Sequence, residues 1–263
     1  MRIKKVKKLI SRITLLFGFT IQKVPALRLF NFKSKGLLNP VYIEFIGASA
    51  VGKTTLYRKL NKKYIRKWLD IRQFAALNSH KNIEELIGPS SFYHDLANSK
   101  ISITVENSVK STGYDKLKSF YLASNAMKQD AYINYFNKKH TILSEEGLLQ
   151  FYSEGVIKLF NENREKLIDL LNRRAIIYCY ASPEIIVQRV LLRKEKTGHL
   201  WQGHKVSSED ELLRAVKRTL DEKEKLINIV KEFVPVLKIN TAQSTASNLK
   251  EIHSFIERVR QLS

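Results

Sequence analysis

The sequence predicts a three-layer α/β fold, in which a parallel sheet is flanked by helices on both faces. First, short apolar runs alternate with longer helix-like stretches, and strands separated by helices favour a parallel sheet. Second, a glycine-containing loop with a phosphate-binding pattern follows the first of these runs and leads into a helix. Third, 44% of the 263 residues are hydrophobic and 10% are aromatic, which suffices for one large core.

Four runs are expected to be strands because they are short, apolar and rich in β-branched or aromatic residues. They are Val41–Ile46, Ile142–Ser144, Ala175–Ala181 and Val234–Ile239. One further strand is expected early in the chain, near Ile71–Phe74 or near Ile101–Val105, and the sequence does not choose between the two.

Helices are expected between and after these strands. One of them has a clear start, because Ser182 is a good capping residue and Pro183 suits the first helical position. The expected helices are Leu56–Tyr64, Lys116–Lys139, Leu148–Arg174, Ile185–Arg193, a stretch opened by Ser207 or Ser208 that ends near Glu232, and Thr245–Arg260.

The net charge of the chain is unevenly distributed. The sequence has 46 Lys and Arg against 25 Asp and Glu, a formal charge of +21. Residues 1–43 hold ten of the basic residues and no acid, which leaves 36 basic and 25 acidic residues in the rest. This asymmetry predicts a basic leader over 1–37 and a main domain over 38–263. The single cysteine, Cys179, excludes a disulfide framework and a multi-thiolate zinc site.

The leader contains a predicted basic amphipathic helix over Met1–Phe19, with most apolar side chains on one arc and most lysines opposite. Such a helix can lie in a membrane interface, with its lysines against anionic headgroups. Arg12 interrupts the apolar stretch, which argues against a membrane span and against a secretory signal. Packing on the main domain, organelle targeting and nucleic-acid contact are the alternatives. We expect a cytoplasmic protein, with peripheral attachment at the inner membrane face if the leader binds lipid.

The strongest motif follows the first predicted strand and matches G-x-x-x-x-G-K-[ST], the phosphate-binding P-loop or Walker A pattern. Its backbone N–H groups and the start of the next helix are suited to bind phosphates. We expect Lys53 to reach the β- and γ-phosphates of ATP, and the Thr54 hydroxyl to help hold Mg²⁺. The predicted nucleotide-binding residues are Gly47, Ala48, Ser49, Ala50, Val51, Gly52, Lys53, Thr54 and Thr55.

Two further pairs of residues are candidates for catalysis. Glu145 and Glu146 end the strand Ile142–Ser144, and an acid at the carboxyl edge of a parallel sheet can hold Mg²⁺ or its water. We expect Glu145 at the metal and Glu146 as a base or acceptor contact; solvated acids at a helix start are the alternative. Arg189 and Arg193 are four residues apart, on one helical face, and are expected to stabilise the transferred phosphoryl group unless they are simply exposed.

The segment at about 194–206 is expected to be a lid over the polyphosphate, because it is strongly basic. Trp201 within it is suited to stack on a base or sugar, and equally to pack against the domain. The histidines of the segment have no acid or cysteine at metal-ligand spacing, so we do not expect a zinc site. Its basic and histidine residues are Lys194, Lys196, His199, His204 and Lys205.

These features resemble those of the P-loop nucleoside and nucleotide kinases, most closely the thymidylate kinase-like proteins. The resemblance covers roughly Val41–Arg260 and implies that arginines of the helix and the lid clasp the transferring phosphoryl group. The family usually has an acid followed by Arg after the third strand, whereas this chain has Glu145-Glu146-Gly147, and no acceptor-side motif is recognisable. The residues that carry the resemblance are Gly47–Thr55, Glu145–Gly147, Ala181–Glu184 with Arg189 and Arg193, and Val236–Ile239.

The sequence therefore predicts an Mg²⁺-ATP-dependent small-molecule kinase whose acceptor is a nucleotide or a sugar or lipid-linked hydroxyl. The high charge keeps a nucleic-acid-associated P-loop ATPase or polynucleotide kinase as the alternative, although no nucleic-acid-binding module is recognisable. A non-enzymatic scaffold is favoured only if Glu145 and Glu146 lie away from the loop. A GTPase is disfavoured, because no Asp-x-x-Gly follows the loop and Asn240–Gln243 lacks the Lys and Asp of a guanine-reading motif.

Overall fold

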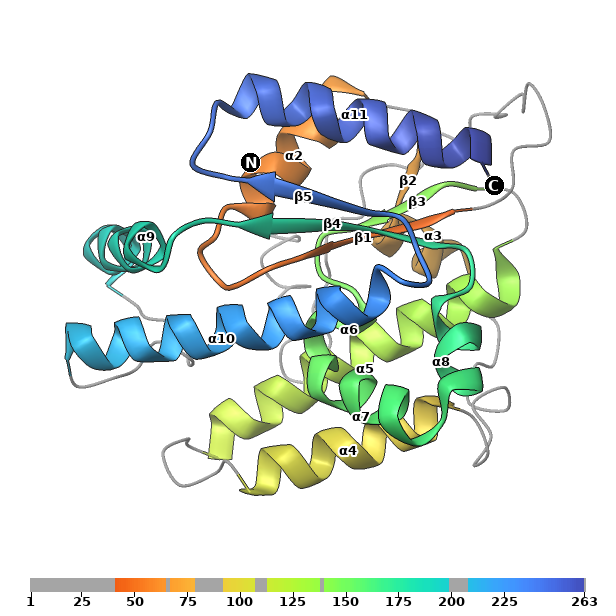
Figure 1. Cartoon of the computed structure of the whole chain (residues 1–263), viewed down its shortest axis with the longest axis horizontal. Coiled ribbons are helices and arrows are strands. Elements are labelled where there is room, and N and C mark those ends of the chain that lie inside the picture. The colour runs from red at the N-terminus through yellow and green to blue at the C-terminus, as the bar shows by residue number, and fades with distance from the viewer. Residues whose placement is uncertain are drawn as a thin grey trace, which may run out of the picture. The chain divides into compact units, whose positions relative to one another are not determined.

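Five parallel strands form one sheet in the order β2-β3-β1-β4-β5 (Figure 1). The computed structural model describes residues 41–64, 67–78, 92–106, 113–137, 140–198 and 208–262. The first strand along the chain is central, and β3 and β4 pair with it on either side. The strands are β1 (Tyr42–Ile46), β2 (Leu69–Asp70), β3 (Ile142–Ser144), β4 (Arg174–Tyr180) and β5 (Val236–Asn240).

Helices cover both faces of this sheet, so the structure has the predicted three-layer α/β architecture (Figure 1). Helices α2 and α11 pack on one face, and α4 to α8 with α10 lie on the other. The helices are α2 (Lys53–Lys63), α3 (Ile71–Asn78), α4 (Phe92–Glu106), α5 (Gly113–Phe136), α6 (Leu148–Phe151), α7 (Ser153–Glu162), α8 (Arg164–Leu171), α9 (Pro183–Thr197), α10 (Glu209–Val230) and α11 (Thr245–Leu262).

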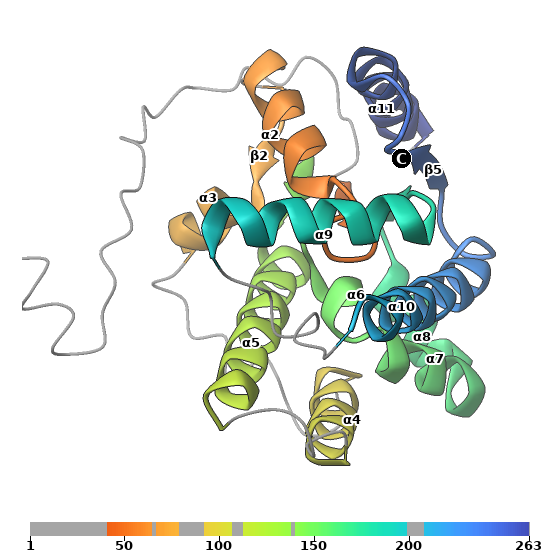
Figure 2. The same cartoon turned by 90° about the vertical axis from the view of Figure 1, so that its left-hand side faces the viewer.

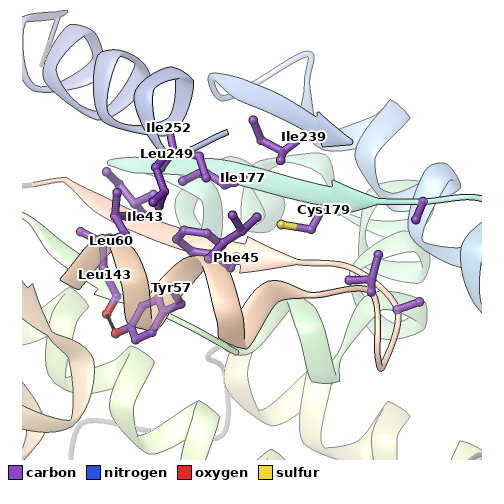
Figure 3. Close-up of a cluster of buried hydrophobic side chains, with 14 of the residues drawn as sticks. Ile43, Phe45, Tyr57, Leu60, Leu143, Ile177, Cys179, Ile239, Leu249 and Ile252 are labelled. Atoms are coloured by element: carbon purple, nitrogen blue, oxygen red, sulfur yellow. Dashed lines mark hydrogen bonds between the residues drawn. The ribbon is translucent and has the colours of Figure 1, made fainter. Parts of the chain in front are cut away.

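The two faces have separate hydrophobic cores because side chains alternate along each strand. Ile43 and Phe45 of β1 point toward α2 and α11, where they meet Tyr57, Ile177 and other buried residues (Figure 3). Ile46 of β1 belongs to the core on the opposite face. β1 is buried along its whole length, as expected of the central strand of a parallel sheet.

The start of α9 is determined locally, as the sequence predicts. Ser182 is the N-cap, with its Oγ accepting a hydrogen bond from the Ile185 amide, and Pro183 occupies the first turn. Gly198 ends the helix in the left-handed conformation, at φ 68°. In Figure 2 the viewer faces the carboxyl ends of the strands, and α9 runs across this edge of the sheet.

A buried charge cluster connects the central strands to the helices below them. Arg174 of β4 donates a hydrogen bond to Asp130 Oδ2 of α5 at 2.7 Å and lies 3.6 Å from the Glu44 carboxyl group of β1. Tyr93 of α4 donates its hydroxyl to Asp130 at 2.8 Å. Burial alone would lower the pKa of Arg174, but the charges of Asp130 and its neighbours outweigh burial and raise it. The arginine therefore stays charged and holds two carboxylates.

Most predicted elements agree with the structure, and the second strand lies near one of its two expected positions. It is Leu69–Asp70, directly before Ile71–Phe74, which itself belongs to α3. The other expected position, Ile101–Val105, lies within α4 and is wrong. The strand has only two residues and pairs with β3 alone, at the edge of the sheet. A strand this short has no periodicity of its own, and its conformation comes from pairing with β3.

The single long helix expected over Leu148–Arg174 is also wrong, because this stretch forms α6, α7 and α8 and its last residue begins β4. Tyr152 and Asn163 interrupt it with non-helical backbone angles. The Asn163 side chain caps α8 by accepting a hydrogen bond from the Lys166 amide at 3.1 Å. The breaks at Tyr152 and Asn163 are one residue long and do not disturb the apolar periodicity of the stretch. The sequence pattern is therefore that of one continuous helix.

The structure describes the first residues of the predicted lid and none of the leader. Helix α9 continues to Thr197, so the first residues of the predicted lid, 194–197, are helical. Residues 199–207, with Trp201, His199, His204 and Lys205, and the leader 1–37 lie outside the described residues. Their predicted roles stay predictions.

Glu44 should make the stability of the protein depend on pH. Burial raises its pKa from 4.5 to about 7, so the folded state keeps a proton that the unfolded chain releases above pH 4.5. The resulting stabilisation is complete below about pH 4.5 and is lost as the pH rises through about 7; the size of the shift corresponds to about 3 kcal/mol. We expect the wild-type stability, relative to a Glu44→Gln variant, to fall by this amount between pH 4.5 and 8.

Urea unfolding of both proteins across this range measures the difference. Because glutamine does not titrate, the other ionisable groups contribute equally to both proteins and cancel. Parallel pH profiles for the two proteins would show that Glu44 is ionised throughout and would contradict the prediction.

Candidate functional site

The P-loop lies where the carboxyl ends of β1 and β4 meet. Gly47, the first residue after β1, has φ 152°, and a Cβ atom there would lie 2.3 Å from the Cys179 carbonyl oxygen of β4. Only glycine fits this close approach. Gly52 is the N-cap of α2 with φ 116°, so the loop passes directly into a helix that starts at Lys53. The strand, loop and helix that the motif requires are therefore all in place.

Lys53 is buried, and its ammonium group points back into the loop. Its Nζ donates to the Gly47 carbonyl at 2.7 Å and to the Ala48 carbonyl at 3.1 Å. Burial lowers the pKa of Lys53, and the negative charge of Glu146, 3.8 Å away, opposes this shift. A cation held only by two carbonyl oxygens and a loosely placed carboxylate is poised to bind an anionic group at the mouth of the loop.

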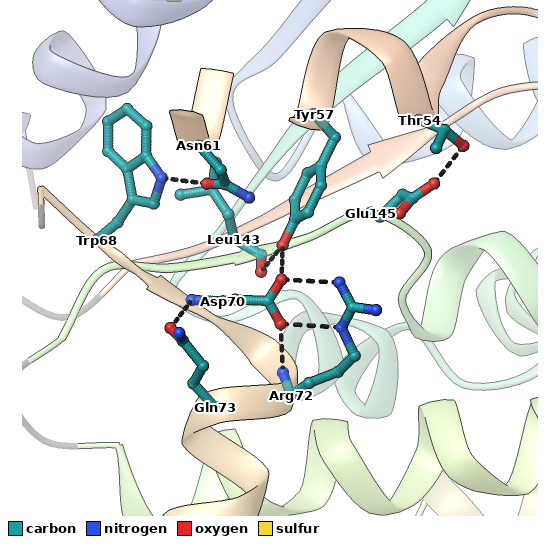
Figure 4. Close-up of polar contacts among 9 residues, drawn as sticks. All are labelled: Thr54, Tyr57, Asn61, Trp68, Asp70, Arg72, Gln73, Leu143 and Glu145. Carbon is teal, nitrogen blue, oxygen red and sulfur yellow. Dashed lines mark hydrogen bonds and ion pairs between the residues drawn. The ribbon is translucent and has the colours of Figure 1, made fainter. Parts of the chain in front are cut away.

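Glu145 lies against the start of α2, as a metal-holding acid should. The Thr54 hydroxyl donates a hydrogen bond to the Glu145 carboxylate, although the two residues are 91 positions apart (Figure 4). A hydroxyl and a carboxylate are hard oxygen ligands of the kind that Mg²⁺ prefers. The pair would therefore be suited to hold a magnesium ion. Among the described residues, no three His, Cys, Asp or Glu side chains form an all-protein metal site.

Gly147 explains why the acidic pair turns toward the loop. A Cβ atom at this position would lie 2.2 Å from Tyr42 Oη and 2.6 Å from Glu44 Cδ, so the backbone must pass directly over β1. Glu146 is then left exposed at the edge, with its carboxylate facing Lys53. Both predicted acids lie beside the P-loop, which removes the condition that favoured a non-enzymatic scaffold.

Arg189 contacts the P-loop backbone, and Arg193 does not. Arg189 Nη1 donates to the Val51 carbonyl at 2.5 Å and to Thr241 Oγ1 at 3.0 Å, and its Nη2 donates to the Thr241 carbonyl at 2.9 Å. Arg193, one turn further along α9, is exposed. The structure thus brings Arg189 together with Lys53 and Thr54 at the loop, and leaves Arg193 toward the predicted lid.

The sequence analysis did not identify Gln150, which contacts the beginning of the P-loop, whereas Arg189 contacts its later part. The Gly47 amide donates to Gln150 Oε1 at 3.1 Å, and the Gln150 amide donates to Glu44 Oε1 at 3.0 Å. Lys223 of α10 is buried and donates to the Gln150 carbonyl at 2.9 Å and also to Ser153 Oγ. An isolated Gln or Lys in a helix carries no recognisable signal, so only the fold could reveal these contacts.

A third acidic residue, Asp70, also lies at the carboxyl edge of the sheet, at the end of β2. Tyr57 of α2 donates its hydroxyl to Asp70 at 2.7 Å, and the Arg72 guanidinium binds the same carboxylate (Figure 4). Burial alone would raise the pKa of Asp70, but the hydrogen bonds from Arg72 and Tyr57 outweigh it and lower the pKa. The sequence signal was missing because β2 itself was not recognised.

Cys179 has no part in nucleophilic chemistry. Its thiol is buried in β4 behind the P-loop, and burial raises its pKa to about 12. A thiol with this pKa is protonated near neutral pH and is a weak nucleophile. The residue serves as a small apolar side chain beneath the loop.

The chain was compared with known proteins in three ways. No family model matches it, and no curated protein matches it. Solved structures do match, among them deoxyadenosine kinase from M. mycoides with products bound, at 14% identity and a TM-score of 0.48, covering 83% of this chain and 100% of that chain.

A gluconokinase from Sinorhizobium meliloti matches at 14% identity and a TM-score of 0.41, over 84% of this chain and 94% of that one. Shikimate kinase from Bacteroides thetaiotaomicron matches at 14% identity and a TM-score of 0.39, over 82% and 98%. The fold class of the present chain rests on its own sheet order and helical layers.

Replacement of Gly147 by alanine should displace the acidic pair. The added Cβ would overlap Tyr42 Oη and the Glu44 carboxylate, so we expect a loss of stability of about 1–3 kcal/mol and weaker Mg²⁺-ATP binding. Urea unfolding and titration calorimetry measure the two effects. Tyr42→Phe removes the nearer obstacle and should restore part of the stability in the double variant, whereas Tyr42→Phe alone should change little. Wild-type stability in Gly147→Ala would contradict the close approach.

Proposed function

We propose that the protein is an Mg²⁺-ATP-dependent phosphotransferase that acts on a small molecule. The observation that carries the proposal is the hydrogen bond between Thr54 and Glu145, because it joins the P-loop hydroxyl to an acid that directly follows the neighbouring strand β3. Resemblance to the thymidylate kinase-like proteins at Gly47–Thr55 and Glu145–Gly147 supports a core of that type.

In the proposed reaction the acceptor hydroxyl oxygen bonds to the γ-phosphorus as the bond from that phosphorus to the β,γ-bridging oxygen breaks. The products are the phosphorylated acceptor, ADP and one proton. Such a reaction needs alignment and charge neutralisation more than covalent help from the protein. A bound Mg²⁺ would neutralise phosphate charge, and Thr54 and Glu145 are the residues suited to hold it.

The other site residues have complementary proposed roles. Lys53 is placed to neutralise the β- and γ-phosphates after exchanging its carbonyl partners for phosphate oxygens. Glu146 is exposed beside Lys53 and is proposed to accept the hydroxyl proton. Arg189 holds the loop and, with Arg193 and the lid at about 194–206, is proposed to stabilise the transferred phosphoryl group.

Removal of the Lys53 ammonium should abolish turnover and leave the fold intact. Lys53→Ala is the simplest variant, and Lys53→Met better preserves the buried volume. We expect a loss of kcat/KM of about 100-fold or more, because the variant lacks a preorganised cation at the developing charge. Circular dichroism and thermal unfolding establish that the variant is folded. Lys59→Met, on the exposed side of the same helix α2, is the matched control and should retain activity. Full activity in Lys53→Met would contradict the proposal.

We further propose that the leader, residues 1–37, binds an anionic membrane surface and brings the enzyme to it. The support is its sequence alone, with ten basic residues and no acid among residues 1–43. No helix among the described residues is long and apolar enough to cross a membrane.

Co-sedimentation with vesicles of phosphatidylcholine and phosphatidylglycerol tests the leader. The full chain should pellet with anionic vesicles at low salt, and a chain lacking residues 1–37 should stay in the supernatant. Binding should weaken at high salt, because the attraction of lysines to headgroups is screened. Equal binding by the two chains would refute the proposal.

A further inference from the structure

A polar pocket lies beside the P-loop, between α4, the start of α7 and α10. Its volume is about 240 Å³, and it is open to solvent on one side. Charged and polar side chains of both signs line it, together with Phe151 and Tyr152. The residues that matter for its chemistry are Lys100, Gln150, Ser153, Glu154, Glu222 and Lys223.

The pocket and the phosphate-binding loop share one residue. Gln150 lines it and also accepts a hydrogen bond from the Gly47 amide, so the same residue contacts the pocket and the loop. The acidic pair Glu145 and Glu146 directly precedes the helix that carries Gln150. The charge of Lys223 is also felt by Lys53, which has its pKa lowered further by this neighbour. A molecule in the pocket would lie next to the site proposed for phosphoryl transfer.

Two of the four charges in the pocket are already satisfied. Lys223 donates to the Gln150 carbonyl, to Ser153 Oγ and to the Glu222 carboxylate at 3.2 Å, which uses its three N–H groups. Glu222 is thereby the ion-pair partner of Lys223. These residues form a preorganised wall and offer no excess charge to a ligand.

The other two charges lack direct partners. Lys100 of α4 and Glu154 of α7 make no hydrogen bond or ion pair within the part of the chain that the structure describes. Burial, reinforced by the charge of Lys223, lowers the pKa of Lys100. Burial and the charge of Glu222 raise the pKa of Glu154. The pocket therefore presents one free ammonium donor and one free carboxylate acceptor on facing helices.

The balance of charge identifies the ligand that fits. The charged residues that line the pocket, two lysines and two glutamates, sum to zero, so the lining itself provides no net attraction for a phosphate or carboxylate group. Among the charges behind the lining, Arg218 also acts on Glu154. A hydroxyl group both donates and accepts hydrogen bonds, and neighbouring hydroxyls can satisfy Glu154 and Lys100 together. The aromatic residues add apolar surface for the C–H groups of such a molecule.

We propose that this pocket binds the phosphoryl acceptor and that the acceptor is an uncharged compound with several hydroxyl groups, either a free sugar or polyol or the sugar of a nucleoside. The proposal rests on the proposed kinase activity. The sequence did not decide the acceptor class, and the proposal favours a neutral hydroxyl compound over a nucleotide. Lys100 and Glu154 are acceptor-binding residues, and neither contributes to the binding of ATP.

The test measures phosphate transfer from γ-labelled ATP by the full chain to two sets of acceptors. The neutral set contains glucose, glycerol, myo-inositol and thymidine, and the charged set contains glucose 6-phosphate and thymidine monophosphate. We expect transfer to a member of the neutral set only. Success with thymidine alone identifies a nucleoside sugar, and success with the other compounds identifies a free sugar or polyol.

Variants of the two free charges connect the activity to the pocket. Lys100→Met should raise the KM for the neutral acceptor about tenfold, which corresponds to the loss of one hydrogen bond to a charged group. Glu154→Gln keeps an acceptor oxygen but loses its charge, so it should raise the same KM by a smaller factor. The KM for ATP should stay within about twofold of the wild-type value. Lys158→Met and Glu162→Gln are matched controls, because both residues are exposed on α7 and outside the pocket. They should leave both KM values unchanged.

Three results would overturn the assignment. The first is transfer to a member of the charged set. The second is transfer to a neutral acceptor that Lys100→Met and Glu154→Gln leave unaffected. The third is that a chain that binds Mg²⁺-ATP transfers phosphate to no neutral acceptor. Calorimetric titration with a non-hydrolysable ATP analogue separates these results from a failure of the kinase proposal itself. A chain that does not bind the analogue fails at the P-loop, whereas one that binds it and transfers to no neutral compound fails at the pocket.

Discussion

The buried carboxyl group of Glu44 connects the sheet to the supports of the P-loop and to the turn after β3. It lies on the central strand, accepts a hydrogen bond from the Gln150 amide and pairs with Arg174 of the neighbouring strand. Gln150 in turn holds the first amide of the P-loop, and Gly147 lets the acidic turn pass within contact distance of Glu44 itself. A buried charge must be paired and hydrogen-bonded to be tolerated. These obligations fix the positions of the loop and the acidic turn relative to the sheet.

The same principle accounts for the state of the site residues. Arg72 is held by Asp70, Arg189 by Val51 and Thr241, and Lys223 by Gln150. These cations have fixed geometries, which suits them for support; for Arg189 this role adds to the one proposed at the transferred phosphoryl group. Lys53 differs, because carbonyl oxygens are exchangeable partners and phosphate oxygens are stronger acceptors for an ammonium group. The arrangement separates residues that build the site from residues that are available to bind substrate.

Local signals predicted the elements whose ends are marked by residues in the sequence itself, such as helix-capping residues. The strand β3 has the predicted bounds, and the start of α9 follows from Ser182 and Pro183. The failures have two physical origins: β2 depends on a tertiary contact, and the break before α8 depends on a local cap at Asn163 that the apolar periodicity does not show. β2 exists because β3 pairs with it, and the stretch after Glu146 breaks at Tyr152 and Asn163 where the chain must turn to cover the sheet.

The sequence by itself determined the chemistry of the phosphate-binding loop, because its glycines, Lys53 and Thr54 are adjacent in the chain and their spacing alone sets the geometry. It also pointed to Glu145 and Glu146 through their place after a buried strand. Only the tertiary structure decided that Thr54 and Glu145 touch, that Gln150 and Lys223 stand behind the loop, and that Lys100 faces Glu154 across a pocket. These pairs lie on different strands and helices, and their meeting depends on strand order and helix packing, which no local pattern encodes.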